Sequence, residues 1–89
     1  MKAEQAIERH LCKRIREKGG ICIKLTEPAG IPDRLAILPD GRNIYIELKA
    51  ECGILSPIQK AIHRRLREMN QTVLTLWNFE EVDEFIAKL

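Results

Sequence analysis

The sequence predicts an α/β fold with the element order αβββαβα, in which helices flank a mixed sheet. Three observations predict this class. Apolar residues recur at helical spacing in three segments, short apolar or alternating segments lie between them, and glycine, proline or asparagine marks most of the boundaries. The chain has 89 residues, 45% hydrophobic and 31% charged, which is typical of a globular protein and excludes disordered and fibrous classes. We therefore expect one domain over residues 1–89, and its small core favours oligomerisation.

The first helix is expected over residues 3–18, where Ile7, Leu11 and Ile15 share one face and Gly19-Gly20 ends the helix. A second helix begins at Ser56, because serine at the N-cap, proline at the first helical position and glutamine at the third form a capping box. Asn70, which tolerates a left-handed conformation, ends it. Its predicted core stripe consists of Ile58, Ala61, Ile62, Leu66 and Met69.

The last helix is expected to begin after Asn78, with Glu81 completing its cap. Its apolar residues are Phe79, Val82, Phe85 and Ile86. Strands are expected over residues 21–26, 35–38, 44–50 and 72–76.

The turn Pro39-Asp40-Gly41 fixes the register of the two middle strands. It suits a three-residue hairpin loop, a type I turn followed by a left-handed glycine, in which Leu38 pairs with Arg42. This register places Asp33 opposite Glu47, on the same face of the sheet. A two-residue loop would instead place Asp33 on the other face.

Glu47 and Lys49 also share this face, because strand side chains alternate. Alone, this pair would indicate an ordinary amphipathic strand with a solvated charged side. However, β-carbons of opposed residues lie about 4.5–5.5 Å apart, so Asp33 and Glu47 repel each other unless a cation lies between them. Two carboxylates and a main-chain carbonyl suit Mg²⁺ or Mn²⁺, and a neighbouring lysine can orient water or stabilise charge on phosphate. The combination indicates phosphodiester hydrolysis.

Several other residues have both a structural and a functional interpretation. Glu4 falls within the apolar stripe of its helix, so we expect it to point inward, as a metal-site acid or as a first-turn acid that complements the helix dipole; Glu8 is the second candidate. The capping box suffices to explain Gln59, and contact with substrate or lysine is secondary. For His10 and His63 we favour a solvated or phosphate-contacting position over a general base.

The formal charge of +2 is unevenly distributed. The first two helices are basic and the last eleven residues are acidic, which suggests a polyanionic partner on one side. On the second helix the basic side chains that form the polar face are Lys60, Arg64 and Arg67.

The three cysteines, Cys12, Cys22 and Cys52, have no zinc-binding or disulfide-framework spacing. We expect free thiols that pack as small apolar side chains and carry no chemistry. No apolar run is long enough to span a bilayer, and residues 1–20 lack the apolar region of a secretory signal, so we expect a cytosolic protein.

Taken together, five features resemble the VRR-NUC family of the PD-(D/E)xK nuclease superfamily. They are Glu4, Gly30-Ile31-Pro32-Asp33-Arg34-Leu35, Pro39-Asp40-Gly41-Arg42, Ile46-Glu47-Leu48-Lys49-Ala50 and Leu55-Ser56-Pro57-Ile58-Gln59. The resemblance is to stand-alone, phage-type members and covers nearly the whole chain. It implies a restriction-endonuclease-like core that acts in the cytoplasm of a bacterial cell or a phage-infected host.

The resemblance also implies a site. Asp33, Glu47 and the carbonyl of Leu48 would bind Mg²⁺ or Mn²⁺, Lys49 would assist the attacking water, Glu4 would support the site, and Gln59 would lie near it. The expected substrate is branched DNA, such as a four-way junction, cleaved by a homodimer similar in kind to Holliday-junction resolvases. Residues expected to contact DNA are Lys13, Arg34, Lys60, Arg64 and Arg67.

Two alternatives remain open. One is a nicking, flap or restriction-type nuclease. The other is a nucleic-acid binding module without catalysis on the same fold.

Overall fold

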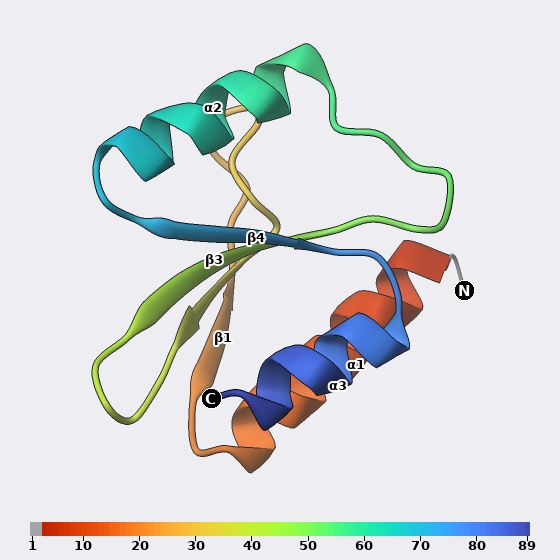
Figure 1. The fold of residues 1–89 in the computed structure, drawn as a ribbon, viewed down its shortest axis with the longest axis vertical. Helices are drawn as coiled ribbons and strands as arrows, with labels where there is room; N and C mark the ends of the chain where they lie inside the picture. Colours follow the sequence, from red (N-terminus) through yellow and green to blue (C-terminus); the bar gives the residue numbers. More distant parts are fainter. Residues whose placement is uncertain (1–2) are drawn as a thin grey trace.

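The computed structural model describes residues 3–89 and has the predicted order of elements (Figure 1). The helices are α1 (Ala3–Glu17), α2 (Pro57–Glu68) and α3 (Phe79–Ala87). The strands are β1 (Ile21–Lys24), β2 (Arg34–Ile37), β3 (Asn43–Leu48) and β4 (Thr72–Leu76). None of the helices over this range is long and apolar enough to cross a membrane.

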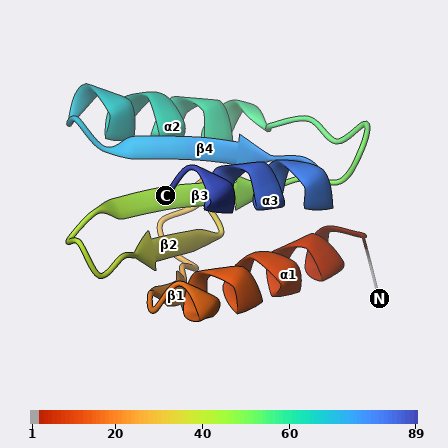
Figure 2. The ribbon, with the colours of Figure 1, turned by 60° about the horizontal axis from the view of Figure 1, so that its bottom comes forward.

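The four strands form one mixed sheet in the order β1-β2-β3-β4. The β1/β2 and β2/β3 pairs are antiparallel, whereas β3 and β4 are parallel and are joined by a crossover through α2. Figures 1 and 2 show α2 on one face of the sheet and α1 beside α3 on the other. The result is a three-layer arrangement in which β1 and β4 are the edge strands.

The main core lies between the sheet and the pair α1/α3. The predicted stripe of α1 is confirmed, since Ile7, Leu11 and Ile15 are all buried. They pack in one cluster with the alternate residues Ile44, Ile46 and Leu48 of β3 and with Val82 and Ile86 of α3. Near the surface, Asp83 of α3 accepts hydrogen bonds from His10 and Arg14 of α1, which links the two helices.

The hairpin and the helix caps form as predicted. The Leu38 amide donates to the carbonyl of Arg42 across the three-residue loop, and Gly41 has a φ of 93°. Ser56 and Gln59 make both hydrogen bonds of the capping box. Asn70 adopts the left-handed conformation, with a φ of 64°. Local turn and cap chemistry therefore sets the strand register and the start of α2.

The predicted core stripe of α2 is wrong for three of its five residues. Ile58 and Met69 are each 56% exposed and Ala61 is also exposed, while only Leu66 is buried and Ile62 is half-buried. The helix packs on edge strand β4, so it covers one side of this sheet face only (Figure 2). Its inward face follows Gln59, Ile62, His63 and Leu66, which is a helical spacing that includes two polar residues.

Candidate active site

Most of the predicted site residues line one pocket at the carboxyl end of β3. The pocket has a volume of about 280 Å³ and lies between the first turns of α1 and the start of α2. Figure 1 shows both helix starts near this end of the sheet. The lining residues are Glu4, Gln5, Glu8, Asp33, Glu47, Leu48, Lys49 and Gln59.

Asp33 and Glu47 meet because of the hairpin register. Arg34 pairs with Ile46, and continuing that register by one residue places Asp33 opposite Glu47, as predicted. The Asp33 carboxylate accepts a hydrogen bond of 2.9 Å from the Leu48 amide, which fixes its position at the end of the strand. The structure therefore brings the two acids to one site although they lie 14 residues apart in sequence.

Gly30 allows the loop that carries Asp33 to approach α2 closely. Its φ is +86°, and a Cβ at this position would lie 2.7 Å from the carbonyl oxygen of Ile58. Backbone contact this short leaves no space for a side chain, and the left-handed conformation favours glycine. The loop and α2 are consequently held together beside the pocket.

Glu47 is almost completely buried, with 2% of its surface exposed. Its Oε2 accepts a hydrogen bond of 3.2 Å from Gln59 Nε2 and lies 3.9 Å from Lys49 Nζ. Burial and the adjacent negative charge of Asp33 raise the pKa of Glu47 to about 8, against the opposing effect of Lys49. The charged form of this carboxylate is thus poorly compensated by the protein alone.

His63 lies beside Glu47, in a position that the sequence did not predict. It is only 1% exposed, so the expectation of a solvated or phosphate-contacting position is wrong. Its Nε2 lies 3.8 Å from Glu47 Oε1. Within residues 3–89, neither ring nitrogen of His63 nor Glu47 Oε1 has a hydrogen-bond partner. The spacing of four residues between Gln59 and His63 was the sequence signal that both face the same way from α2.

The capping-box interpretation of Gln59 is confirmed, and its side chain also contacts Glu47. Its side-chain oxygen accepts from the Ser56 amide at 2.9 Å, which closes the capping box, while its Nε2 donates to Glu47. One amide group therefore anchors the start of α2 and orients the buried carboxylate.

The two acids of α1 have different surroundings. Glu4 lines the pocket with Asp33 and Glu47, although its side chain is exposed. Glu8 is half-buried and forms ion pairs with Arg34 at 2.6 Å and with Lys24 at 3.3 Å. Glu8 is consequently neutralised by basic residues of β1 and β2.

The donor set fits a small, hard divalent cation. Two carboxylates and the main-chain carbonyl of Leu48 are oxygen ligands. The raised pKa of Glu47, whose Oε1 has no hydrogen-bond partner within residues 3–89, indicates that Lys49 does not fully compensate the two acids. No three His, Cys, Asp or Glu side chains among residues 3–89 lie close enough to form a complete metal cage. Mg²⁺ needs none, because it retains several water ligands and is commonly bound through one or two carboxylates.

The basic residues expected to contact DNA lie outside this pocket. Lys60 and Arg64 are exposed on α2, and Arg67 donates to the Val73 carbonyl at 3.0 Å. Lys13 and Arg34 line another pocket beside α1, and Arg34 is already paired with Glu8. The basic side chains of α1 and α2 therefore flank the sheet from opposite faces.

Comparison with known proteins identifies the family. No family model matches the chain. A phage protein named "Putative nuclease p44", from Acyrthosiphon pisum secondary endosymbiont phage 1, is 40% identical over 75 residues, which are 82% of this chain and 81% of the relative. A solved structure described as a "VRR_NUC domain" superposes with a TM-score of 0.92 and 30% identity, over 98% of this chain and 97% of that one. The chain belongs to the VRR-NUC family.

Membership of VRR-NUC agrees with the fold and with the nuclease class predicted from the sequence. The structural match covers nearly the whole chain, so the pocket at the end of β3 lies within the shared VRR-NUC fold.

Proposed function

We propose that residues 1–89 form one VRR-NUC domain that hydrolyses phosphodiester bonds in DNA as an endonuclease dependent on Mg²⁺ or Mn²⁺. The observation that carries the proposal is the buried Glu47, whose pKa is raised to about 8 beside Asp33. An acid that is costly to ionise, and whose Oε1 finds no hydrogen-bond partner in the described part of the chain, is a poor structural element but a suitable cation ligand. Asp33, Glu47 and the Leu48 carbonyl would hold the ion.

Each neighbouring residue has a role in this proposal. A divalent cation at the site would supply positive charge to the attacked phosphate and lower the pKa of water. Lys49, whose side chain is only 15% exposed, would orient the attacking water and stabilise the negative charge that develops on phosphate. Gln59 would hold Glu47 in position, and Glu4 would support the site from the open side of the pocket.

DNA binding is proposed to use the basic residues on both sides of the pocket. Lys13 of α1 and Lys60 and Arg64 of α2 are exposed, and they flank the sheet from opposite faces. Arg34 and Arg67 also have protein partners, so their proposed phosphate contacts are additional to those hydrogen bonds. A duplex that reached the end of β3 could contact both groups, without any base-specific contact.

Homodimerisation is proposed from the apolar surface that the chain leaves open. Cys22 packs against the core under α1, so Ile21 and Ile23 of β1 point to the face that carries α2. The helix lies over β4 at the opposite edge, and these isoleucines are 61% and 38% exposed. A second copy could cover them, and a two-fold dimer would offer two equivalent sites to a two-fold symmetric four-way junction.

The decisive test is a cleavage assay with a panel of labelled DNAs: duplex, single strand, flap, nicked duplex and four-way junction. We expect cleavage with Mg²⁺ or Mn²⁺, none with EDTA, and paired symmetric incisions in the junction. Glu47→Gln and Lys49→Met should each lower the rate by at least about 100-fold. The control Glu68→Gln, an exposed acid on α2, should be as active as wild type.

The alternatives predict different results. Preference for the flap or nicked duplex, or sequence-dependent cleavage of linear DNA, would indicate the other nuclease types. Salt-sensitive binding without cleavage of any substrate would indicate the binding module. Full activity of folded Glu47→Gln and Lys49→Met proteins would refute the assignment of the site.

A further inference from the structure

Two cysteines from different elements lie together on the α1 side of the sheet. Cys12 is buried on α1 and Cys22 is half-buried on β1, and their sulfur atoms are 3.1 Å apart. Both are free thiols in the structure, as predicted. We propose that Cys12 and Cys22 form a reversible redox site, in which a peroxide oxidises the two thiols to an intramolecular disulfide. The nuclease proposal is not needed for this inference.

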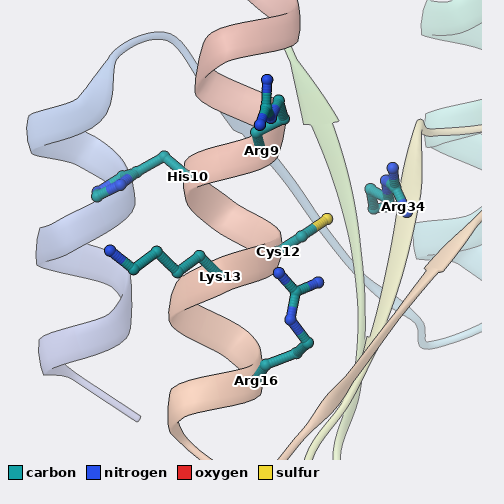
Figure 3. A pocket seen from close by; sticks show the side chains of 6 residues that line it. All are labelled: Arg9, His10, Cys12, Lys13, Arg16 and Arg34. Carbon is teal, nitrogen blue, oxygen red and sulfur yellow. The ribbon is translucent and has the colours of Figure 1, made fainter.

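The surroundings of Cys12 favour a reactive thiolate. It lines a pocket of about 420 Å³ whose other lining residues are all basic: Arg9, His10, Lys13, Arg16 and Arg34. Figure 3 shows the sulfur of Cys12 pointing away from α1, to the side on which Arg34 lies. His10 and Lys13 project to the opposite side of α1 in Figure 3, so the positive charge that acts on the sulfur is that of Arg34 and Arg16. Such charge stabilises the thiolate anion, which is the form that reacts with peroxides.

The two thiols have unequal acidity. The hydrogen bond with Cys22 and the nearby charge of Arg34 lower the pKa of Cys12 to about 7, against the opposing effects of burial and Glu8. The same hydrogen bond and burial raise the pKa of Cys22, so that thiol retains its proton. Cys12 is therefore the thiol that ionises more readily and acts as the nucleophile, while Cys22 is the second thiol that resolves the oxidised sulfur.

The reaction balances with one peroxide per disulfide. The Cys12 thiolate attacks a peroxide oxygen, the O–O bond breaks, and Cys12 becomes a sulfenic acid while hydroxide leaves and takes up a proton as water. The Cys22 sulfur then attacks the Cys12 sulfur, the S–O bond breaks, and a second water leaves with the Cys22 proton. Two sulfurs are oxidised by two electrons in total, and a dithiol reductant reverses the reaction.

Little movement is needed to form the bond. The sulfurs at 3.1 Å must approach by about 1 Å to reach the disulfide length of about 2.05 Å. The bond would join the middle of α1 to β1 across the Gly19-Gly20 turn. It would restrict the unfolded chain, so the oxidised protein should unfold at a higher urea concentration than the reduced protein.

The test uses the whole chain with Cys52→Ser, because Cys52 is exposed and would otherwise form disulfides between molecules. The protein is treated with an equimolar amount of hydrogen peroxide and assayed by thiol titration, intact mass and urea unfolding. We expect both thiols to be lost per peroxide consumed, a monomeric chain lighter by two hydrogens, and a higher urea midpoint that returns to its first value with dithiothreitol. Proteolytic fragments should contain Cys12 linked to Cys22.

Matched controls are Cys12→Ser and Cys22→Ser, each combined with Cys52→Ser. Neither should lose two hydrogens or shift its urea midpoint on oxidation. Because Cys12 is buried, the Cys22→Ser protein and the linked fragments keep the test valid if Cys12→Ser does not fold. The proposal is overturned if the Cys52→Ser protein keeps both thiols, gains only oxygen, or forms only cross-linked dimers.

Discussion

Replacing Glu47 by glutamine should lower the cleavage rate but raise the free energy of unfolding at high pH. The variant keeps the shape of the side chain and its contact with Gln59 but removes the ionisable proton. In the metal-free protein the pKa of Glu47 is raised from 4.5 to about 8, and one pKa unit corresponds to about 1.4 kcal/mol. The full shift therefore corresponds to about 5 kcal/mol, which is large for a domain of this size.

The sign follows from which state binds more protons. Below pH 4.5 the glutamate is protonated in both the folded and unfolded chain, so wild type and Glu47→Gln should differ little. Between pH 4.5 and pH 8 the unfolded chain ionises while the folded chain retains its proton, so the free energy of unfolding of wild type falls. Above pH 8 both states are ionised, and the variant should be more stable by up to about 5 kcal/mol.

The assay is urea unfolding followed by circular dichroism at several pH values between 4.5 and 9, with EDTA and a reductant present. Comparing the two proteins at each pH removes contributions from groups that titrate alike in both. Glu68→Gln, which changes an exposed acid, should give a curve parallel to wild type. If the Glu47→Gln curve is also parallel to wild type, within about 1 kcal/mol, Glu47 is not the poorly compensated buried acid described above.

Three further results are expected. At pH 8, Mg²⁺ at about 100 times its Kd should raise the free energy of unfolding of wild type by about 2.7 kcal/mol and leave that of Glu47→Gln unchanged. Equal stabilisation of both proteins would contradict the proposed metal site. In Gly30→Ala the new Cβ would clash with the Ile58 backbone, so the free energy of unfolding in urea should fall by about 2 kcal/mol or more. In Gly41→Ala the Cβ has space, and the free energy of unfolding should fall by about 1 kcal/mol; equal losses in the two variants would disprove the close approach of Gly30 to Ile58. In DNA-binding titrations, Arg64→Ala should make the negative slope of log K against log salt shallower by about 0.9. An unchanged slope would show that Arg64 does not contact DNA phosphate.

The sequence could predict the pairing of Asp33 with Glu47 because a local turn determines it. Pro39-Asp40-Gly41 favours a three-residue loop with a left-handed glycine over a two-residue loop, and the loop length sets the register of every later pair in the hairpin. Side-chain alternation then places both acids on one face. The capping box and the end of α2 at Asn70 are likewise local, and these features also formed as predicted.

The inward face of α2 could not be predicted in the same way. Its apolar residues fit a helical stripe that includes Ile58 and Met69, but the helix lies over an edge strand and places Gln59 and the buried His63 against Glu47. Tertiary position therefore overrides the hydrophobic pattern, since the buried acid on β3 needs polar neighbours. The exposure of the β1 isoleucines could not be predicted either. Long-range packing determines which part of a sheet face is covered by a helix.

The sequence also could not predict that Cys12 lies next to Cys22. They lie ten residues apart in two elements joined by the Gly19-Gly20 turn, and their spacing matches no disulfide or metal motif. Only the packing of β1 against α1 brings the sulfurs within hydrogen-bonding distance.

The most direct measurement is a crystal structure of the protein soaked with Mn²⁺, with anomalous scattering used to locate the ion. The account predicts one anomalous peak in contact with Asp33, Glu47 and the Leu48 carbonyl, and no peak there in Glu47→Gln crystals. A peak elsewhere with none at this site, or an ion bound equally well to the Glu47→Gln protein, would contradict the claim that these two acids form a metal site.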